Sequence, residues 1–324
     1  MTETVELRGS VPADAAGNRL DQVLAGLFPE YSRSRLQQWL KAGQVTVDGR
    51  RLRPRDRVRG GESVHVRATL EPEVRLEAEA IPLDVVYEDA DILVVDKPAG
   101  LVVHPGAGNP AGTLQNALLH RHPELETVPR CGIVHRLDKD TSGLLVVALN
   151  LRAHASLVDQ LQEKTMGREY DALVNGTFTA GGRIEGRLAR HPVDRKRMAV
   201  TETGGRKAVT HYRIAERFSA HTLLRVYLET GRTHQIRAHM AWIRHPLVGD
   251  PVYGGRARLP RGADERVRAA LAAFRRQALH AARLSLVHPV SGEPMRWDAP
   301  RPADLEQLLE ALRSHDRRPG ACRT

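Results

Sequence analysis

A polar segment enclosed by two apolar runs most constrains what this chain can fold into. Residues 131–148 read C-G-I-V-H-R-L-D-K-D-T-S-G-L-L-V-V-A, so that residues 135–143 are polar and residues 144–148 are apolar. Short runs rich in Val, Ile and Leu beside a Ser-Gly pair predict a strand, a loop and a second strand. Because rigid scaffolds commonly present chemical groups on such loops, this segment is the candidate functional site.

The charge balance of the chain indicates a polyanionic partner. Lysine and arginine number 49 against 39 aspartates and glutamates, which gives a formal net charge of +10. This surplus favours nucleic acid, because no apolar run approaches the ~20 residues that cross a bilayer. The first residues lack the basic and apolar regions of a secretory signal, and two cysteines are too few for a disulfide framework. We therefore expect a cytoplasmic protein without membrane contact.

Residues 18–67 form a small module of their own. Apolar residues recur at helical spacing over residues 18–27, and Ser32 is placed to cap a second helix. Two short strands follow, over residues 45–47 and 64–66. The pattern predicts an independent α/β domain ahead of the rest of the chain.

An arginine-rich run separates these two strands. Residues 50–59 read R-R-L-R-P-R-D-R-V-R. In an extended segment, arginines at every second position lie on one side, which suits them to follow a phosphate backbone. Most arginine runs are only solvated surface, and that alternative remains open here. The alternating residues are Arg51, Arg53, Arg55, Arg57 and Arg59.

The pattern beyond this module predicts an α+β domain over residues 85–305. Residues 68–84 are acidic and poor in bulky apolar side chains, as in a linker. From residue 85 on, several β-type runs occur with few helical segments and no regular βα repeat, which predicts a mixed, mostly antiparallel sheet. Three runs over residues 85–106 read as successive strands. For residues 306–324 we expect a helix end and a disordered tail.

Four sequence blocks resemble one known family. They read D-K-P-A-G-L-V-V-H-P, H-R-L-D-K-D-T-S-G-L, G-R-E-Y-D-A-L-V-N-G and L-E-T-G-R-T-H-Q-I-R-A-H-M, the last followed by H-P-L-V-G-D-P-V-Y-G-G. These blocks resemble the RluA-type pseudouridine synthase family. The stretch S-R-S-R-L-Q-Q-W-L-K-A-G-Q-V-T-V-D-G resembles S4 RNA-binding domains. The resemblance implies a pseudouridine synthase fold, with its mostly antiparallel sheet, behind an S4-like α/β module.

The S4 resemblance implies RNA contacts on the second helix of the module and on the loop after it. The arginine run adds two more candidates to these. In the second domain, the arginine after His135 lies beside the candidate acid, and the basic run 190–198 is a further candidate contact. The expected RNA-binding residues are Arg33, Ser34, Arg35, Lys41, Arg51, Arg53, Arg136 and Arg190.

The resemblance assigns the catalytic carboxylate to Asp138. Pseudouridine formation breaks the C1′–N1 bond of uridine, rotates the base and joins C5 to C1′. An ionised carboxylate can attack C1′, as in retaining glycosidases, or remove a proton from C2′ to give a glycal, and the sequence leaves both routes open. Spacing alone does not exclude Asp140, which lies on the same side of an extended segment.

The resemblance implies two further catalytic residues. Arg232 matches an arginine that pairs with the catalytic acid, and a fixed guanidinium would keep that carboxylate ionised. Tyr170 matches an active-site tyrosine that can stack on uracil and help to remove the C5 proton. Without the resemblance, Arg232 reads as a phosphate contact and Tyr170 as a core residue at strand spacing.

The sequence predicts neither a metal nor an organic cofactor. His135 and Asp138 lack a third ligand at supporting spacing, and His234 and His239 lie five residues apart, off the spacing of a helical zinc pair. The glycines of residues 106–112 are not followed by the Lys-Ser or Lys-Thr pair of a nucleotide-binding loop.

The expected activity is the isomerisation of uridine to pseudouridine in 23S (large-subunit) ribosomal RNA by a monomeric enzyme. Transfer RNA as substrate remains open. Two other classes of protein are possible from the residues alone. One is an S4-type RNA-binding or ribosome-assembly protein without catalysis. The other is a glycosidase built on Asp138 and Asp140, although these two acids lie too close in sequence to flank a bond easily.

Overall fold

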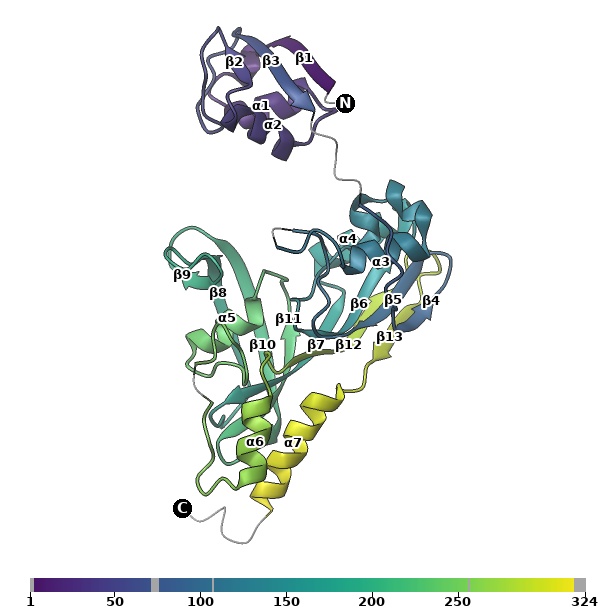
Figure 1. The fold of residues 1–324 in the computed structure, drawn as a ribbon, viewed down its shortest axis with the longest axis vertical. Helices are drawn as coiled ribbons and strands as arrows, with labels where there is room; N and C mark the ends of the chain where they lie inside the picture. Colours follow the sequence, from purple (N-terminus) through teal and green to yellow (C-terminus); the bar gives the residue numbers. More distant parts are fainter. Residues whose placement is uncertain (1–2, 71–75, 107, 256, 318–324) are drawn as a thin grey trace. The chain divides into compact units, whose positions relative to one another are not determined.

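The computed structural model describes residues 3–70, 76–106, 108–255 and 257–317 (Figure 1). The chain divides into two compact units, Met1–Arg75 and Leu76–Thr324, each with a hydrophobic core of its own. In these described ranges no helix is both long enough and apolar enough to cross a membrane. The tail expected at the C-terminus falls in residues 318–324, which lie outside the described residues.

Unit 1 packs two helices on a three-stranded antiparallel sheet. The strand order is β1-β3-β2, with β1 (Glu3–Ser10) paired to β3 (Ser63–Leu70) along its whole length. The unit therefore begins before residue 18, where the sequence pattern placed its start. The expected strand over residues 45–47 and the Ser32 cap are both present, because the Ser32 side chain accepts a hydrogen bond from the backbone N–H of Arg35. The other elements are η1 (Ala13–Ala15), α1 (Leu20–Leu27), α2 (Arg33–Lys41) and β2 (Val45–Val47).

The arginine run of unit 1 is not an extended strand. The five alternating arginines are exposed, as the pattern predicts. The backbone turns between Arg53 and Asp56, however, where the N–H of Asp56 donates to the carbonyl of Arg53. The Arg57 guanidinium also donates to the carbonyl of Gly17. The expected straight stripe is therefore wrong, because Pro54 and Asp56 favour a turn over a strand.

Unit 2 is built on a ten-stranded sheet with the order β4-β5-β6-β12-β7-β11-β10-β8-β9, and β13 pairs with β12 off this path. All pairs are antiparallel except β6 with β12. The expected α+β class and mostly antiparallel sheet are confirmed. The strands are β4 (Val85–Glu88), β5 (Ile92–Lys97), β6 (Ser142–Ala148), β7 (Gly167–Asn175), β8 (Gly182–Arg190), β9 (Met198–Thr201), β10 (Arg206–Arg217), β11 (His221–Leu228), β12 (Leu279–Val287) and β13 (Pro294–Asp298).

Helices cover the two ends of this sheet. Figure 1 shows α6 and α7 side by side at one end, where their leucines and those of neighbouring strands form a separate core cluster. The third run expected before residue 106 is not a strand, since only Val102 forms an isolated bridge there. The helices are α3 (Leu114–Arg121), η2 (Pro123–Thr127), η3 (Pro129–Gly132), α4 (Leu151–Glu163), α5 (Gln235–Trp242), α6 (Glu265–Ala273) and α7 (Ala303–Asp316).

The middle of the sheet positions the polar segment singled out from the sequence. β6 is the strand that follows this segment. All seven of its residues are buried, so that packing on both faces holds the strand in place. At the start of β6, Gly143 has a φ of 112°, and a Cβ there would collide with the backbone of Ala281 in β12. Glycine is therefore required for the parallel pairing that holds the end of the loop in place.

Candidate active site

The polar segment forms a loop over residues 135–141 between η3 and β6. The expected first strand is absent, because Ile133 makes only an isolated bridge with Val147. Within the loop, the N–H of Thr141 donates to the carbonyl of Asp138 at 3.1 Å and closes a turn. The loop borders a cavity of about 730 Å³. Asp138 lines this cavity, whereas its rival Asp140 is not among the described residues that line it.

A buried lysine holds this loop through hydrogen bonds to backbone carbonyls. Lys97 is 1% exposed, and its Nζ donates to the carbonyls of Pro98, Leu101 and Lys139 at 2.8–3.0 Å. Lys139 directly follows Asp138, so the first sequence block is tied to the second. Burial lowers the pKa of Lys97 to about 8, even though the neighbouring carboxylates of Asp140 and Asp138 favour its charge.

The guanidinium that pairs with Asp138 belongs to Arg237. Its Nη1 donates to Asp138 Oδ2 at 3.0 Å, while Nε and Nη2 donate to the two carboxylate oxygens of Asp250 at 2.7 and 2.9 Å. Asp250 is in turn fixed by the N–H groups of Val252 and Tyr253. Burial alone would lower the pKa of Arg237, but the Asp250 and Asp138 carboxylates raise it above its ordinary value. The guanidinium is therefore a permanent charge of fixed orientation.

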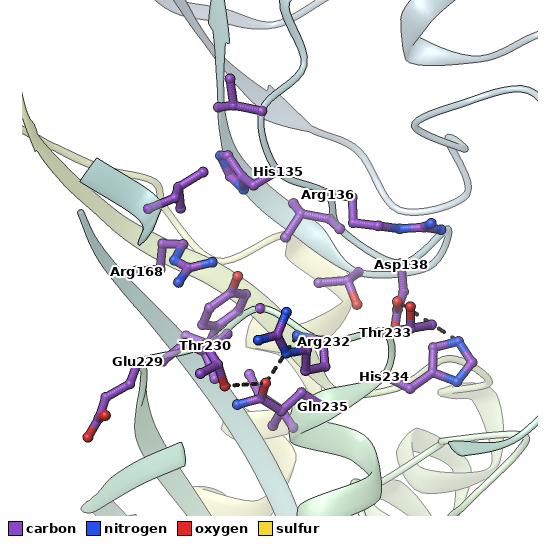
Figure 2. Close-up of a pocket in the computed structure, with 18 of the residues that line it drawn as sticks. His135, Arg136, Asp138, Arg168, Glu229, Thr230, Arg232, Thr233, His234 and Gln235 are labelled. Carbon is purple, nitrogen blue, oxygen red and sulfur yellow. Dashed lines mark hydrogen bonds and ion pairs between the residues drawn. The ribbon is translucent and has the colours of Figure 1, made fainter. Parts of the chain in front are cut away.

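Arg232 occupies a different position from the one expected. Its Nε donates to the carbonyl of Lys207 at 3.2 Å, and its backbone N–H donates to Gln235 Oε1 at 3.0 Å. The expectation that Arg232 pairs with Asp138 is wrong, although both residues line the same cavity (Figure 2). The two arginines belong to one sequence block, and periodicity could not separate them because residues 235–240 of α5 are all buried.

Tyr170 points from β7 into the cavity and is 5% exposed. It shares a face of the strand with Ala172 and Val174, as the alternation in the sequence predicted. Burial raises the pKa of the Tyr170 hydroxyl, with opposing effects from Arg168 and Asp138. The phenol therefore carries its proton at neutral pH.

Two residues that the sequence pattern did not single out complete the site. His234 is the residue that precedes α5, and its backbone lies in the left-handed region at φ 52°. Its Nε2 lies 3.9 Å from Asp138 Oδ1, and its Nδ1 lies 3.1 Å from the Tyr253 hydroxyl. The Gln235 side chain binds the Thr230 hydroxyl and the backbone of β10, and thereby sets the loop before α5.

The expected RNA-binding residues of unit 1 differ from one another in exposure and in the partners of their side chains. Arg33 pairs with Asp21 at 2.7 Å, and its side chain is 45% exposed. Burial alone would raise the pKa of Asp21, but hydrogen bonds from Arg19 and Arg33 lower it to about 2. Lys41, Arg51 and Arg53 are exposed, Arg35 is half-buried, and the side chain of Ser34 lies outside the described residues.

The two expected RNA contacts of unit 2 are not brought together. Arg136 is exposed and lines the cavity beside Asp138. Arg190 lies at the end of β8, is exposed, and donates to the carbonyl of Arg195 at 3.3 Å. It is not among the described residues that line the cavity.

One group of side chains in the described ranges has the geometry of metal ligands, and it lies outside the cavity. Asp89, Asp91 and His288 each offer an atom within 4.8 Å of the others. Their hydrogen bonds are already taken, because Asp89 accepts from the Tyr87 hydroxyl and contacts His288 at 3.0 Å, and Asp91 accepts from Asn150. The group joins two turns of the sheet.

Comparison with known proteins identifies the family of each unit. The family described as RNA pseudouridylate synthase matches residues 91–242, and the S4 domain matches residues 18–64. The chain is 57% identical to ribosomal large subunit pseudouridine synthase D of Xanthomonas campestris pv. campestris, over 95% of this chain and 93% of that one. It is 54% identical to the Escherichia coli (strain K12) protein of the same name, over 97% and 96%.

Solved structures give the same fold for unit 2. Human RNA Pseudouridylate Synthase Domain Containing 1 covers 76% of this chain and 98% of its own, with a TM-score of 0.53 and 26% identity. Human RNA Pseudouridylate Synthase Domain Containing 4 matches 71% of this chain and 93% of its own, with a TM-score of 0.56 and 21% identity. This match supports the fold alone. The cavity around Asp138 thus lies in a protein that belongs to the pseudouridine synthase family, with an S4 domain at its N-terminus.

Proposed function

We propose that this protein converts specific uridines of large-subunit ribosomal RNA to pseudouridine in the cavity at Asp138. The observation that carries the proposal is the Asp138–Arg237 pair, which lines one cavity together with Tyr170. The names of the most similar relatives supply the class of RNA. A ribosome-assembly protein without catalysis would not need an oriented carboxylate in a cavity, and a glycosidase would not need an S4 domain.

Asp138 acts as the carboxylate that breaks the glycosidic bond. Arg237 aims it, since its guanidinium donates to Asp138 Oδ2 at 3.0 Å and is itself held by Asp250. Attack on C1′ or removal of the C2′ proton breaks the C1′–N1 bond and releases the uracil as its N1 anion. The freed base then turns so that C5 bonds to C1′, which displaces the Asp138 carboxylate from C1′ in the first route or returns a proton to C2′ in the second, and the C5 proton leaves last. Both routes use Asp138 as a carboxylate, whose orientation the Arg237 pair fixes.

Tyr170 supplies the wall on which the uracil stacks. Its ring lies in the cavity, and aromatic faces bind planar bases with little dependence on sequence. Because burial raises the pKa of Tyr170, its hydroxyl can take the C5 proton only after its own proton has left. Stacking is therefore the role that the protonated phenol favours.

The target base reaches this site by leaving its stack. The cavity is open to solvent-exposed Arg136 at its rim, while Tyr170 lies deep within it. Enzymes that act on a base inside a helix extrude the nucleotide into such a pocket. We expect a uridine in a loop or a weak helix to be the preferred substrate, because unstacking it costs least.

Unit 1 holds the RNA outside the reaction site. Arg33, Lys41, Arg51 and Arg53 are exposed cations there, and phosphate contacts supply much of the affinity of RNA-binding proteins. We assign these residues, with Ser34 and Arg35, to RNA contact. We further propose that the enzyme acts in the cytoplasm, and that it acts as a monomer, since Asp138, Arg237 and Tyr170 come from one chain.

Release of tritium from the uracil tests this function. Bonding of C5 to C1′ expels the C5 hydrogen, so an unmodified large-subunit ribosomal RNA transcript labelled at C5 should lose tritium to water. Asp138→Asn should abolish the release while the affinity for RNA stays within a few-fold, because phosphate contacts, and not Asp138, supply the binding energy. Release by the Asp138→Asn variant at more than a small fraction of the wild-type rate would refute the assignment of Asp138. Addition of a chelator should leave the rate unchanged.

A further inference from the structure

Arg168 is a buried cation that the reaction described above does not use. It lies on β7, two residues before Tyr170, and is 7% exposed. It lines the cavity, and its Nε is buried without a hydrogen-bond partner among the described residues. Leaving a buried charge unpaired is costly, so such groups in native proteins are ordinarily matched by a partner.

A glycine of the cavity loop makes room for this guanidinium. A Cβ on Gly231 would lie 2.7 Å from Arg168 Nη1, closer than two such atoms can approach. Gly231 belongs to the block E-T-G-R-T-H, and its backbone has no positive φ that would demand glycine for another reason. A larger residue at position 231 would therefore have to displace the Arg168 guanidinium.

Two more arginines converge on the same part of the cavity. Arg206 and Arg232 line it together with Arg168. Burial lowers the pKa of Arg232, and the charges of Arg206 and Arg168 lower it further, which indicates that both guanidinium groups lie close enough to repel that of Arg232. No ion pair in the described part of the chain includes any of the three.

Glu229 is the one carboxylate besides Asp138 among the described residues that line the cavity, and it is already engaged. Glu229 pairs with Lys164 at 3.0 Å and with His211 at 2.6 Å. Because Glu229 is paired with these two residues, it forms no ion pair with the three arginines within the described ranges.

His135 adds a neutral donor at the same end. Its Nε2 accepts from the backbone N–H of Val146 at 3.1 Å, so the proton of the neutral ring lies on Nδ1. Burial lowers the pKa of His135 to about 3, and Nδ1 is buried without a partner among the described residues. Figure 2 shows His135 and Arg168 at one end of the cavity and Asp138 and His234 at the other.

We propose that Arg168, Arg206 and Arg232 form a binding site for a phosphate of the RNA strand, adjacent to the uridine whose ribose reaches Asp138. The proposal rests on the proposed function, since it names the group of the same RNA that enters this end of the cavity. Three guanidinium groups without a carboxylate suit a phosphodiester better than an uncharged uracil oxygen, because charge-assisted, bidentate pairs are the strong ones. Arg232 is thus a phosphate-binding residue and not the partner of the acid.

The salt dependence of RNA binding by the full chain tests this site. The variants are Arg168→Gln and, as a matched control, Arg296→Gln, which removes an exposed arginine on β13 away from the cavity. The probe is the unmodified large-subunit ribosomal RNA transcript. We expect Arg168→Gln to weaken binding ten- to hundredfold at low salt and to reduce the slope of log affinity against log salt by roughly one. The control should change neither quantity by a comparable amount.

The stability of the free protein separates ligand binding from a structural role. Removal of an unpaired buried charge should leave the melting temperature of Arg168→Gln unchanged or higher. A lower melting temperature together with an unaltered salt slope would mean that Arg168 only supports the fold, and would overturn the proposal. Arg168→Lys should restore most of the slope, because it keeps the charge.

The remaining outcomes also decide the proposal. Weaker RNA binding with an unchanged salt slope would mean that Arg168 binds an uncharged oxygen of the base. This result would refute the proposed phosphate site. If the wild-type protein released no tritium, the proposed function would fail. A slope reduced by Arg168→Gln would in that case still support a phosphate site.

Discussion

Arg237 donates a hydrogen bond from Nη1 to Asp138 Oδ2 at 3.0 Å, and the other edge of the same guanidinium is clamped by Asp250. Arg237 is 5% exposed and Asp250 3%, so that the clamp is shielded from water. The carboxylate of the loop is thus aimed by a residue of α5, which is itself held by the turn after that helix. The orientation of Asp138 depends on three separate segments of the chain.

Arg237→Lys should lower the rate of tritium release at saturating RNA by about a hundredfold or more. A lysine keeps the charge but cannot bind Asp138 and Asp250 at once with a planar fork, and loss of one preorganised donor typically costs a factor of this size. Single-turnover kinetics measure the effect. Arg232→Lys is the control, and it should alter KM more than the rate. Equal losses of rate in the two variants would contradict the distinction between them.

Lys97→Met should lower the free energy of unfolding by about 2–4 kcal/mol and also reduce activity. The carbonyls of Pro98, Leu101 and Lys139 would each lose their donor, and buried acceptors without partners are costly. Urea denaturation measures the change. Lys207→Met removes an exposed lysine of the same sheet and should cost less than about 0.5 kcal/mol. A loss of stability equal to that of the control would show that Lys97 does not hold the loop.

Local patterns predicted the fold well where each element has its own periodicity or cap. The Ser32 cap of α2 and the buried position of Tyr170 on β7 follow from residues close in the sequence. β1 was missed because only Val5 and Leu7 alternate in a charged segment, and because its partner β3 lies more than fifty residues away. That pairing is a tertiary contact, which no local signal carries.

The site was predictable in its residue types but not in all of its pairs. Asp138 and Tyr170 line one cavity, as expected for residues of one site. The partner of Asp138 depends on which side of α5 faces the loop, and this is decided by the Arg237–Asp250 contact across a turn. Lys97 could not be recognised either, because its acceptors are backbone carbonyls, which leave no trace in the sequence.

Deletion of Met1–Arg75 should weaken RNA binding and flatten its salt dependence, while unit 2 stays folded. Each unit has its own hydrophobic core, and the deletion removes the exposed arginines of unit 1 with their phosphate contacts. Circular dichroism would confirm the folded state, and filter binding across a salt series would give the slope. A slope equal to that of the full chain would show that unit 1 does not bind RNA.

Stability should fall as the pH is lowered from 7 to 5, because several histidines of unit 2, among them His221 and His239, are buried in the neutral form. His221 and His239 are both 0% exposed, and burial lowers the pKa of each to about 4. Between that value and the ordinary pKa of 6.5, the unfolded chain binds protons that the folded chain does not, so acidification favours unfolding by roughly 2 kcal/mol for each histidine. Asp96 opposes this trend, since burial raises its pKa to about 6 and it is protonated more readily in the folded state.

Urea denaturation at pH 7 and pH 5, followed by tryptophan fluorescence in a Trp39→Phe background, reports on unit 2 alone because the other tryptophans belong to it. His221→Phe should reduce the pH dependence by about the contribution of one histidine, and a variant with the full wild-type dependence would show that His221 does not contribute.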